Sequence, residues 1–197
     1  MNLEKHILAP LLILKGDNQK TLEEYKNEKF YIATGDLGFG MFAQCDIAPG
    51  SIIYVFGGPL IDLAETKKRG ERECMPIQID YDTYIDTMVP GCYVNHSCSP
   101  NAGIANDYEL VALRLIKARE EIRFDYSTTM LEQSFTMECR CGKPNCRRRV
   151  CDFTLLPPKI QCDYLQKKMV MSYIMHEFET GVSADSGSTS DLTAAST

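Results

Sequence analysis

Tyr93-Val94-Asn95-His96-Ser97-Cys98-Ser99-Pro100-Asn101 is the stretch of this chain that decides the fold. Polar, apolar and turn-forming residues are mixed in it without the period of a helix or a strand. A run of this kind predicts a functional site. Two later segments give the stretch its meaning: residues 121–126, EIRFDY, and residues 139–146, CRCGKPNC.

Together and in this order, the three segments resemble the SET-domain family of protein-lysine methyltransferases. An NHSC-type loop, an EIxFDY strand and a CxCx4C tail rarely occur together by chance, and the match covers about residues 35–158. The resemblance implies a mainly β (α+β) fold. Several small sheets would surround a threaded, pseudoknot-like segment, with a zinc-bound post-SET cap and a C-terminal helix.

Composition is that of an ordinary globular protein. The chain has 197 residues, 44% of them hydrophobic, which suits one domain with tails or a small annex. The apolar stretch at residues 7–14 is too short to cross a bilayer and lacks the flanks of a signal peptide. We therefore expect an intracellular, soluble protein of the nucleus or cytoplasm, or of a host cell if it is a microbial effector.

Charge is unevenly distributed along the chain. Residues 1–113 carry nine basic and sixteen acidic side chains, whereas residues 114–149 carry nine basic and five acidic ones. An acidic body does not indicate nucleic-acid binding, and we expect none. It would suit a lysine-rich peptide, although ordinary solvated charge explains it equally well.

Short apolar runs separated by turns favour a mainly β domain over βαβ units. The expected strands are residues 30–33, 41–45, 51–56, 77–86, 109–115 and 121–126, with one helix at 62–73. Helical spacing after Pro157-Pro158 predicts a further helix at 159–178. The predicted divisions are an annex (1–28), a SET domain (29–130), a post-SET zinc segment (131–158), the C-terminal helix (159–178) and a disordered tail (179–197).

The resemblance assigns cofactor binding to five residues. Gly38-Phe39-Gly40 matches the family's GxG turn, which lies beside the methionine part of S-adenosylmethionine. In an arbitrary protein two such glycines often mark only a hairpin. Asn95 and His96 match the pair that holds the amino and adenine ends of the cofactor, so His96 is a binding residue rather than a proton carrier.

Tyr126 is the predicted catalytic residue, although a tyrosine that ends a strand is more often a packing residue. Its hydroxyl would orient the lysine amine or hold the methyl group through a weak C–H···O contact. Phe124 holds a position linked to how many methyl groups are added, and phenylalanine there leaves room in the lysine channel. Tyr84 is a candidate channel wall, with a strand-core tyrosine as the equal alternative.

Nine cysteines, an odd number, favour a reducing compartment. Cys139, Cys141 and Cys146 are one thiolate short of a tetrahedral four-cysteine site. The family supplies the fourth ligand from the NHSC loop, here Cys98, for one structural Zn²⁺. The other five are expected to be small buried residues: Cys45, Cys74, Cys92, Cys151 and Cys162.

Two positions depart from the family pattern. A tyrosine that many relatives carry falls near Met75 here, so that cofactor contact is in doubt. Arg119 stands at a turn where relatives usually have glycine, which suggests a different turn.

The function implied by the resemblance is S-adenosylmethionine-dependent methylation of a protein lysine, with a histone tail as the first-guess substrate and no membrane partner. Two alternatives stay open. One is a methyltransferase dedicated to a single non-histone protein, and the other is a non-catalytic, zinc-stabilised binding module.

Overall fold

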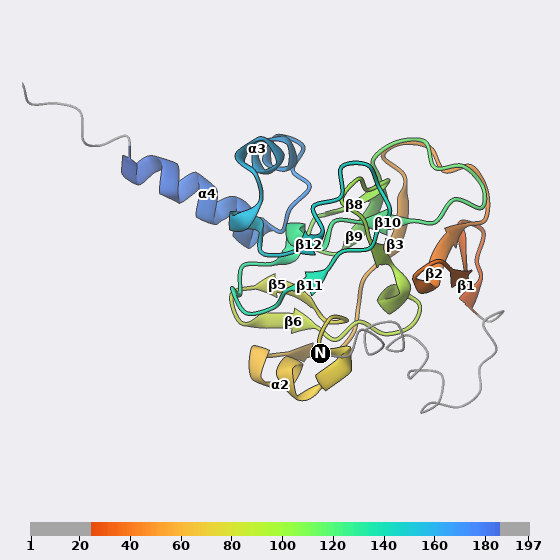
Figure 1. Ribbon diagram of the computed structural model, residues 1–197, viewed down its shortest axis with the longest axis horizontal. Coiled ribbons are helices and arrows are strands. Elements are labelled where there is room, and N and C mark those ends of the chain that lie inside the picture. Colours follow the sequence, from red (N-terminus) through yellow and green to blue (C-terminus); the bar gives the residue numbers. More distant parts are fainter. Residues whose placement is uncertain (1–24, 186–197) are drawn as a thin grey trace, which may run out of the picture.

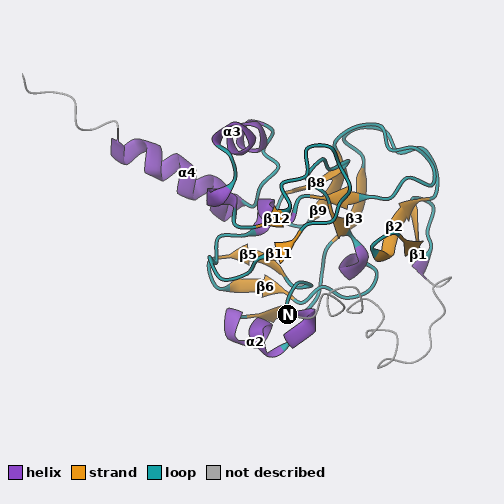
Figure 2. Ribbon diagram, in the orientation of Figure 1, coloured by secondary structure: helices purple, strands orange, loops and turns teal. Residues whose placement is uncertain are grey.

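The computed structural model describes residues 25–185, which form many short strands and few helices (Figure 1). These strands make five sheets of two or three strands each (Figure 2). The arrangement confirms the predicted mainly β fold class. Residues 1–24, in the predicted annex, and 186–197, in the predicted tail, lie outside the described part. The threaded segment stays a prediction.

The first hairpin pairs β1 (Phe30–Gly35) with β2 (Gly38–Ala43) in antiparallel register. Side chains alternate between core and surface along β1, as the period of a strand requires. The turn places Gly38 at φ 94°, a conformation that glycine adopts without the steric cost of a side chain. The two strands predicted at 30–33 and 41–45 are therefore one hairpin.

Two three-stranded antiparallel sheets form the body of the domain. One has the order β3-β9-β8 and the other β4-β6-β5. Their strands are β3 (Ile52–Val55), β4 (Leu60–Ile61), β5 (Ile77–Asp80), β6 (Thr83–Ile85), β8 (Ala102–Ala105) and β9 (Glu109–Ala112). The strand residues predicted at 77–86 are thus a hairpin, and the strand predicted at 109–115 ends at Ala112.

The motif segments meet in a short parallel pair, β7 (Asn95–His96) with β10 (Arg123–Phe124). The predicted strand at 121–126 is limited to β10, because a 3-10 helix, η4 (Tyr126–Thr129), follows at once. Asp125 caps that helix by accepting a hydrogen bond from the Ser127 N–H. Tyr126 therefore opens a helical turn rather than ending a strand.

Buried apolar side chains form two clusters. The larger unites side chains of the sheets with the C-terminal helices. The smaller one surrounds three of the four predicted metal ligands and also contains Met130 and Val150. Val150 belongs to a second antiparallel pair, β11 (Met137–Glu138) with β12 (Arg149–Val150), which flanks the cysteines.

The single C-terminal helix predicted at 159–178 is wrong. The chain forms α3 (Pro158–Gln166) and α4 (Ser172–Asp185), which run in different directions in Figure 1. Lys168 adopts a left-handed conformation, φ 53°, between them. The Met171 N–H then donates to the Thr128 carbonyl, so a tertiary hydrogen bond replaces a helical one.

Smaller corrections have similar local causes. The predicted helix at 62–73 divides into α2 (Leu63–Lys68) and the 3-10 helix η2 (Gly70–Arg72), because Gly70 has φ 59°. The predicted disordered tail begins at 179, but α4 continues to Asp185. Arg119 has φ 69°, so this turn keeps the left-handed conformation that glycine favours. None of the helices within residues 25–185 is long and apolar enough to cross a membrane.

Candidate functional site

The GxG turn and the NHSC loop are joined by the side chain of Asn95. Its Nδ2 donates to the Phe39 carbonyl at 3.0 Å and to Oε1 of Glu121 at 2.8 Å. A Cβ on Gly40 would lie 2.6 Å from that same Glu121 oxygen, closer than packed atoms allow. Glycine at position 40 therefore lets three segments of the chain meet at one point.

Glu121 is held in turn by Arg123, with which it forms an ion pair that is about nine-tenths buried. Arg123 also donates to the Cys141 carbonyl at 3.4 Å. One short chain of polar contacts thus runs from the GxG turn to the cysteine segment. The motif contained Glu121, but its role as a link between segments had no signal in sequence spacing.

His96 is buried and neutral. Burial lowers its pKa to about 4. The negative charge of Asp125 would raise the pKa, and the positive charges of Arg147 and Arg123 offset part of that effect. Nδ1 of His96 accepts from the Tyr126 N–H at 3.2 Å, which leaves the proton on Nε2, 3.4 Å from Sγ of Cys98. The 3.5 Å approach of Nδ1 to Asp125 is therefore not an ion pair. These contacts suit the predicted binding role better than proton transfer.

The Tyr126 hydroxyl donates to the Val94 carbonyl at 2.9 Å. Burial raises the pKa of Tyr126 well above 10, so the hydroxyl stays protonated. Its ring lies 4.9 Å from Phe124 and 5.4 Å from His96, between centroids. Tyr126 can orient a bound group by hydrogen bonding, but it cannot serve as a base near neutral pH.

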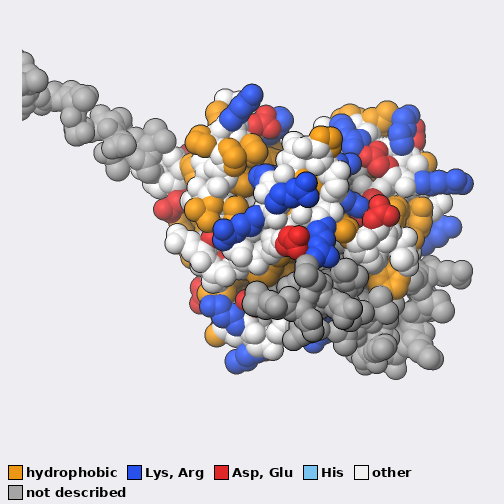
Figure 3. Space-filling model, viewed as in Figure 1, with side chains coloured by type: hydrophobic (Ala, Val, Ile, Leu, Met, Phe, Trp, Pro, Cys, Tyr) orange, Lys and Arg blue, Asp and Glu red, His pale blue; other side chains and the backbone are white. Residues whose placement is uncertain are grey.

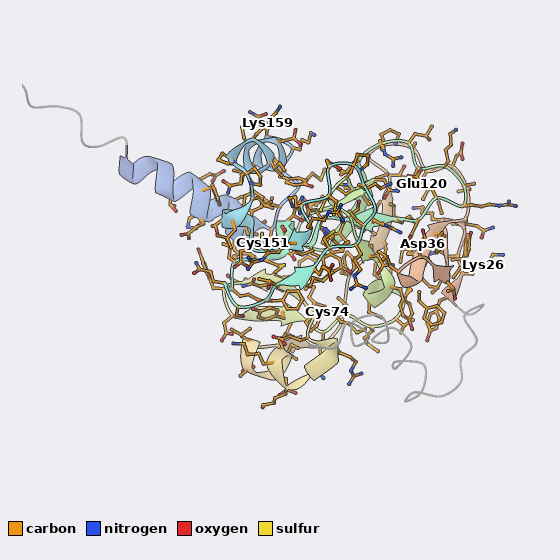
Figure 4. All side chains as sticks on the ribbon, viewed as in Figure 1. Lys26, Asp36, Cys74, Glu120, Cys151 and Lys159 are labelled. Atoms are coloured by element: carbon orange, nitrogen blue, oxygen red, sulfur yellow. The ribbon has the colours of Figure 1, made fainter. Side chains whose placement is uncertain are left out.

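A cavity of about 50 Å³ opens beside Tyr126. Phe124 and Tyr84 line it, as does Cys74, which Figure 4 labels. The structure thus brings the two residues predicted for the channel, Phe124 and Tyr84, together with the predicted catalytic Tyr126, although their roles stay predictions. Tyr84 is also 98% buried, as a strand-core tyrosine would be, and its role as a channel wall stays a prediction.

Four cysteines gather on the other side of His96. Sγ of Cys139 lies 3.6 Å from Sγ of Cys98 and 3.6 Å from Sγ of Cys146. These separations are far longer than a disulfide bond of about 2.05 Å. All four sulfurs lie within 4.8 Å of one another and could hold a metal ion: Cys98, Cys139, Cys141 and Cys146.

The predicted burial of the other cysteines is only partly right. Cys45 and Cys162 are exposed, because they lie on the surface of a loop and of α3. Cys74, Cys92 and Cys151 are partly buried. Two of these, Cys74 and Cys92, line the cavity beside Met75.

Asp125 links the cysteine cluster to Tyr164 through two hydrogen bonds. Its Oδ1 accepts from Arg147 at 2.7 Å, and its Oδ2 accepts from the Tyr164 hydroxyl at 3.0 Å. Arg147 also donates its backbone N–H to Sγ of Cys98 at 3.4 Å. Asp125 is almost completely buried, so loss of Arg147 would leave an uncompensated charge beside Tyr126. The motif analysis assigned no role to Asp125, and it expected Arg147 only to offset the negative charge of a zinc–thiolate cluster.

Comparison with known proteins connects this geometry to a family. Residues 38–127 match the family model described as "SET domain". The chain is 27% identical over 146 residues to "Histone-lysine N-methyltransferase trr" of Drosophila melanogaster, covering 66% of this chain and 6% of that protein. It is 34% identical over 148 residues to "Variant-silencing SET domain-containing protein" of Plasmodium falciparum, covering 64% and 6%.

A third relative is "Histone-lysine N-methyltransferase ASHH3" of Arabidopsis thaliana. It is 30% identical over 151 residues, covering 68% of this chain and 41% of the relative. The chain therefore spans less than half the length of each of these relatives. The matches confirm the resemblance predicted from the three motif segments.

Proposed function

The chain belongs to the SET-domain family through residues 38–127, and on this premise we propose that it transfers a methyl group from S-adenosylmethionine to the side-chain amine of a protein lysine. The observation that carries the proposal is the position of Tyr126. Its ring contacts His96 of the NHSC loop, and it also lines the cavity. The hydroxyl therefore lies where a cofactor side and a substrate side would meet.

The cofactor's place is supported by the donors and the space around the GxG turn. Gly40 has no room for a side chain, and Asn95 holds the turn through the Phe39 carbonyl. The Tyr93 hydroxyl is buried, its ring is 5.6 Å from that of Phe39, and it has no hydrogen-bond partner among residues 25–185. A buried polar group of this kind calls for a ligand or water. When bound, S-adenosylmethionine supplies a methyl group on a positively charged sulfur.

The protein's task in this reaction is alignment and exclusion of water. The amine nitrogen must lie in line with the methyl–sulfur bond, and a well-oriented pair of groups reacts much faster than free ones. The aromatic rings of Phe124 and Tyr126 border the cavity and limit its hydration. The Tyr126 hydroxyl, fixed by Val94, would hold the nitrogen or the methyl group in that line.

We propose that Zn²⁺ occupies the four-cysteine cluster as a structural ion. A tetrahedron with Zn–S bonds of about 2.3 Å has edges of about 3.8 Å, close to the 3.6 Å separations between the sulfurs. Burial raises the pKa of the Cys98 thiol to about 11, so binding must displace protons from the cluster. Arg147 lies at the cluster and would offset part of its negative charge.

A histone tail is the first substrate that we propose. The printed names of the relatives in Drosophila melanogaster and Arabidopsis thaliana support it, and so does the net charge of -6. Such a substrate would place the protein in the nucleus. On the face seen in Figure 3, Lys and Arg side chains are interspersed with fewer Asp and Glu side chains. That nucleic acid is not a direct partner stays a prediction.

Transfer of a labelled methyl group separates this function from a binding module. Purified protein would be incubated with S-adenosylmethionine carrying a labelled methyl group and with core histones, then with an array of lysine peptides. We expect label on lysine, detected by mass spectrometry. Label on one non-histone protein alone would favour a dedicated methyltransferase. No transfer by a protein that binds S-adenosylhomocysteine would favour the non-catalytic module.

A further inference from the structure

A carboxylate that the motifs did not reveal lines the cavity beside Tyr126. Glu132 and Glu73 are the two acidic residues of its wall. Glu132 is hydrogen-bonded to a second wall residue, since the Tyr84 hydroxyl donates to its Oε2. Within residues 25–185, no lysine or arginine forms a salt bridge with Glu132. A negative group thus faces the cavity without a cationic partner from the described chain.

The segment that carries Glu132 is fixed residue by residue. The Met171 N–H donates to the Thr128 carbonyl, and the Tyr173 hydroxyl donates to the Thr129 carbonyl at 2.8 Å. The Phe153 N–H then donates to the Met130 carbonyl at 2.9 Å. These three hydrogen bonds therefore hold the end of η4 and Met130, just before Glu132.

The next hydrogen bond fixes the residue before Glu132. The buried Gln78 of β5 accepts from the Leu131 N–H at 3.0 Å, and its amide nitrogen donates to the carbonyls of Asp80 and Tyr81. Gln78 therefore uses both ends of its side chain to anchor this segment to a strand turn. Together with the hydrogen bond from Tyr84 to the Glu132 carboxylate, this holds Glu132 in one orientation at the cavity.

The other titratable groups of the wall are poor proton acceptors. Burial raises the pKa of Tyr126 and of the Cys74 thiol, and it raises that of Cys92 to about 12. These three groups therefore stay protonated near neutral pH. Among the wall residues, the carboxylates Glu73 and Glu132 remain.

Such an acceptor would accelerate the proposed methyl transfer near neutral pH. A lysine ammonium has a pKa of about 10.4, so about one amine in 10³ is neutral near pH 7.5. Only the neutral amine has the lone pair that attacks the methyl carbon. A fixed carboxylate at the amine would take up the proton in the site, and general-base catalysis of this kind contributes about 10²–10⁴-fold.

We propose that Glu132 is the proton acceptor for the substrate lysine, with Tyr84 as its positioning residue. The proposal rests on the proposed function. An ammonium N–H bond breaks and its proton passes to Oε1 of Glu132, which makes no hydrogen bond within the described residues. The nitrogen lone pair then forms the N–CH₃ bond while the S–CH₃ bond breaks and its electrons stay on sulfur. The proton on Glu132 afterwards leaves to water.

The groups around Glu132 shift its pKa in opposite directions. Burial raises its pKa, and the hydrogen bond from Tyr84 of β6 lowers it. Asp152, just before the 3-10 helix η5 (Phe153–Leu155), and Glu73, after η2, raise it, whereas Lys67 of α2 lowers it. The uncharged hydroxyl of Tyr173 from α4 also lies close. Rate should therefore rise with pH as Glu132 loses its proton.

The test is Glu132→Gln, which keeps the shape of the side chain and removes its basicity. We expect kcat at pH 7.5 to fall about 10²–10³-fold and to recover toward the wild-type value as the pH approaches about 10, where lysine loses its own proton. The charge-matched control is Glu65→Gln on the surface of α2, which should keep wild-type kcat. Calorimetry with S-adenosylhomocysteine verifies that each variant is folded.

The outcomes are distinct. A rise in KM with unchanged kcat at every pH would reduce Glu132 to an ion-pair partner and overturn the proposal. A fall in kcat at pH 7.5 in Glu73→Gln rather than in Glu132→Gln would overturn the proposal as well. Tyr84→Phe provides a second measurement should Glu132→Gln fail to fold. It removes a hydrogen bond that lowers the pKa of Glu132, so the acid limb of its rate profile should move to higher pH, and an unmoved limb would contradict us. If the wild type transfers no methyl group, the proposed function fails rather than this assignment.

Discussion

Replacing Tyr126 with phenylalanine removes one oxygen atom from the site and keeps the ring contacts with Phe124 and His96. The structural loss is the hydrogen bond to the Val94 carbonyl, which belongs to a residue that is 98% buried. An unsatisfied buried acceptor costs about 1–3 kcal/mol. In a domain of this size, each kcal/mol lowers Tm by about 2–4 °C. The variant should therefore fold with a modestly reduced Tm.

The catalytic loss should be separate from that cost. If the hydroxyl acts in the transition state, kcat for methyl transfer should fall about 10²-fold or more, which is about 2.7 kcal/mol. Affinity for S-adenosylhomocysteine should change far less, because the ring and the NHSC loop remain. Single-turnover methyl transfer, calorimetry and thermal unfolding measure the three quantities on one preparation.

A matched control is Tyr54→Phe, which removes the hydroxyl of a partly buried tyrosine in β3. It should lower Tm at most slightly and keep kcat. Wild-type turnover in Tyr126→Phe would refute the catalytic assignment. A fall in kcat that merely follows the loss of folded protein would refute it too, and unfolding curves at the assay temperature distinguish that case.

Three further predictions follow from the same geometry. Purified protein should contain about one zinc ion per chain by metal analysis, and chelation should loosen residues 137–150 in hydrogen exchange while the β core stays folded; a disulfide within the cluster would contradict this. Asn95→Ala should weaken S-adenosylhomocysteine binding by about 1–3 kcal/mol in calorimetry, because the Phe39 carbonyl and Glu121 lose a donor; unchanged affinity would make the residue purely structural. Phe124→Tyr should shift the product toward monomethyl-lysine in mass spectrometry by filling space in the cavity, and an unchanged product ratio would refute the channel role.

Short motifs predicted which residues come together better than they predicted the elements around them. The four metal-ligand candidates, and Tyr126 with His96, were named from spacing and resemblance alone, and the structure brings each set together. Such residues stand in motifs because their chemical groups must meet. The break between α3 and α4 has a different kind of cause. The Met171 N–H donates to the carbonyl of Thr128, a residue far away in sequence, instead of to a carbonyl one helical turn earlier.

Residues that act through a neighbour could not be identified from the sequence either. Asp125 lies within the FDY motif, yet its links to Arg147 and Tyr164 depend on elements that the motif does not contain. Glu132 stands among ordinary loop residues, and only its place in the cavity wall distinguishes it. The different turn expected at Arg119 was wrong, because arginine there adopts the left-handed conformation that glycine favours, which residue type alone does not reveal.

The contacts of the site join parts of the chain that are made at different times during synthesis. His96 and Tyr126 lie 30 positions apart, and Cys98 and the Arg147 that contacts it lie 49 apart. Closing such loops costs entropy before any contact offsets it, and non-local pairing slows folding. On the ribosome, the NHSC segment therefore emerges long before its partners. Until they follow, its thiol and apolar side chains remain exposed to oxidants and to other nascent chains, so this protein would depend on chaperones and on a reducing environment during its synthesis more than in its finished state.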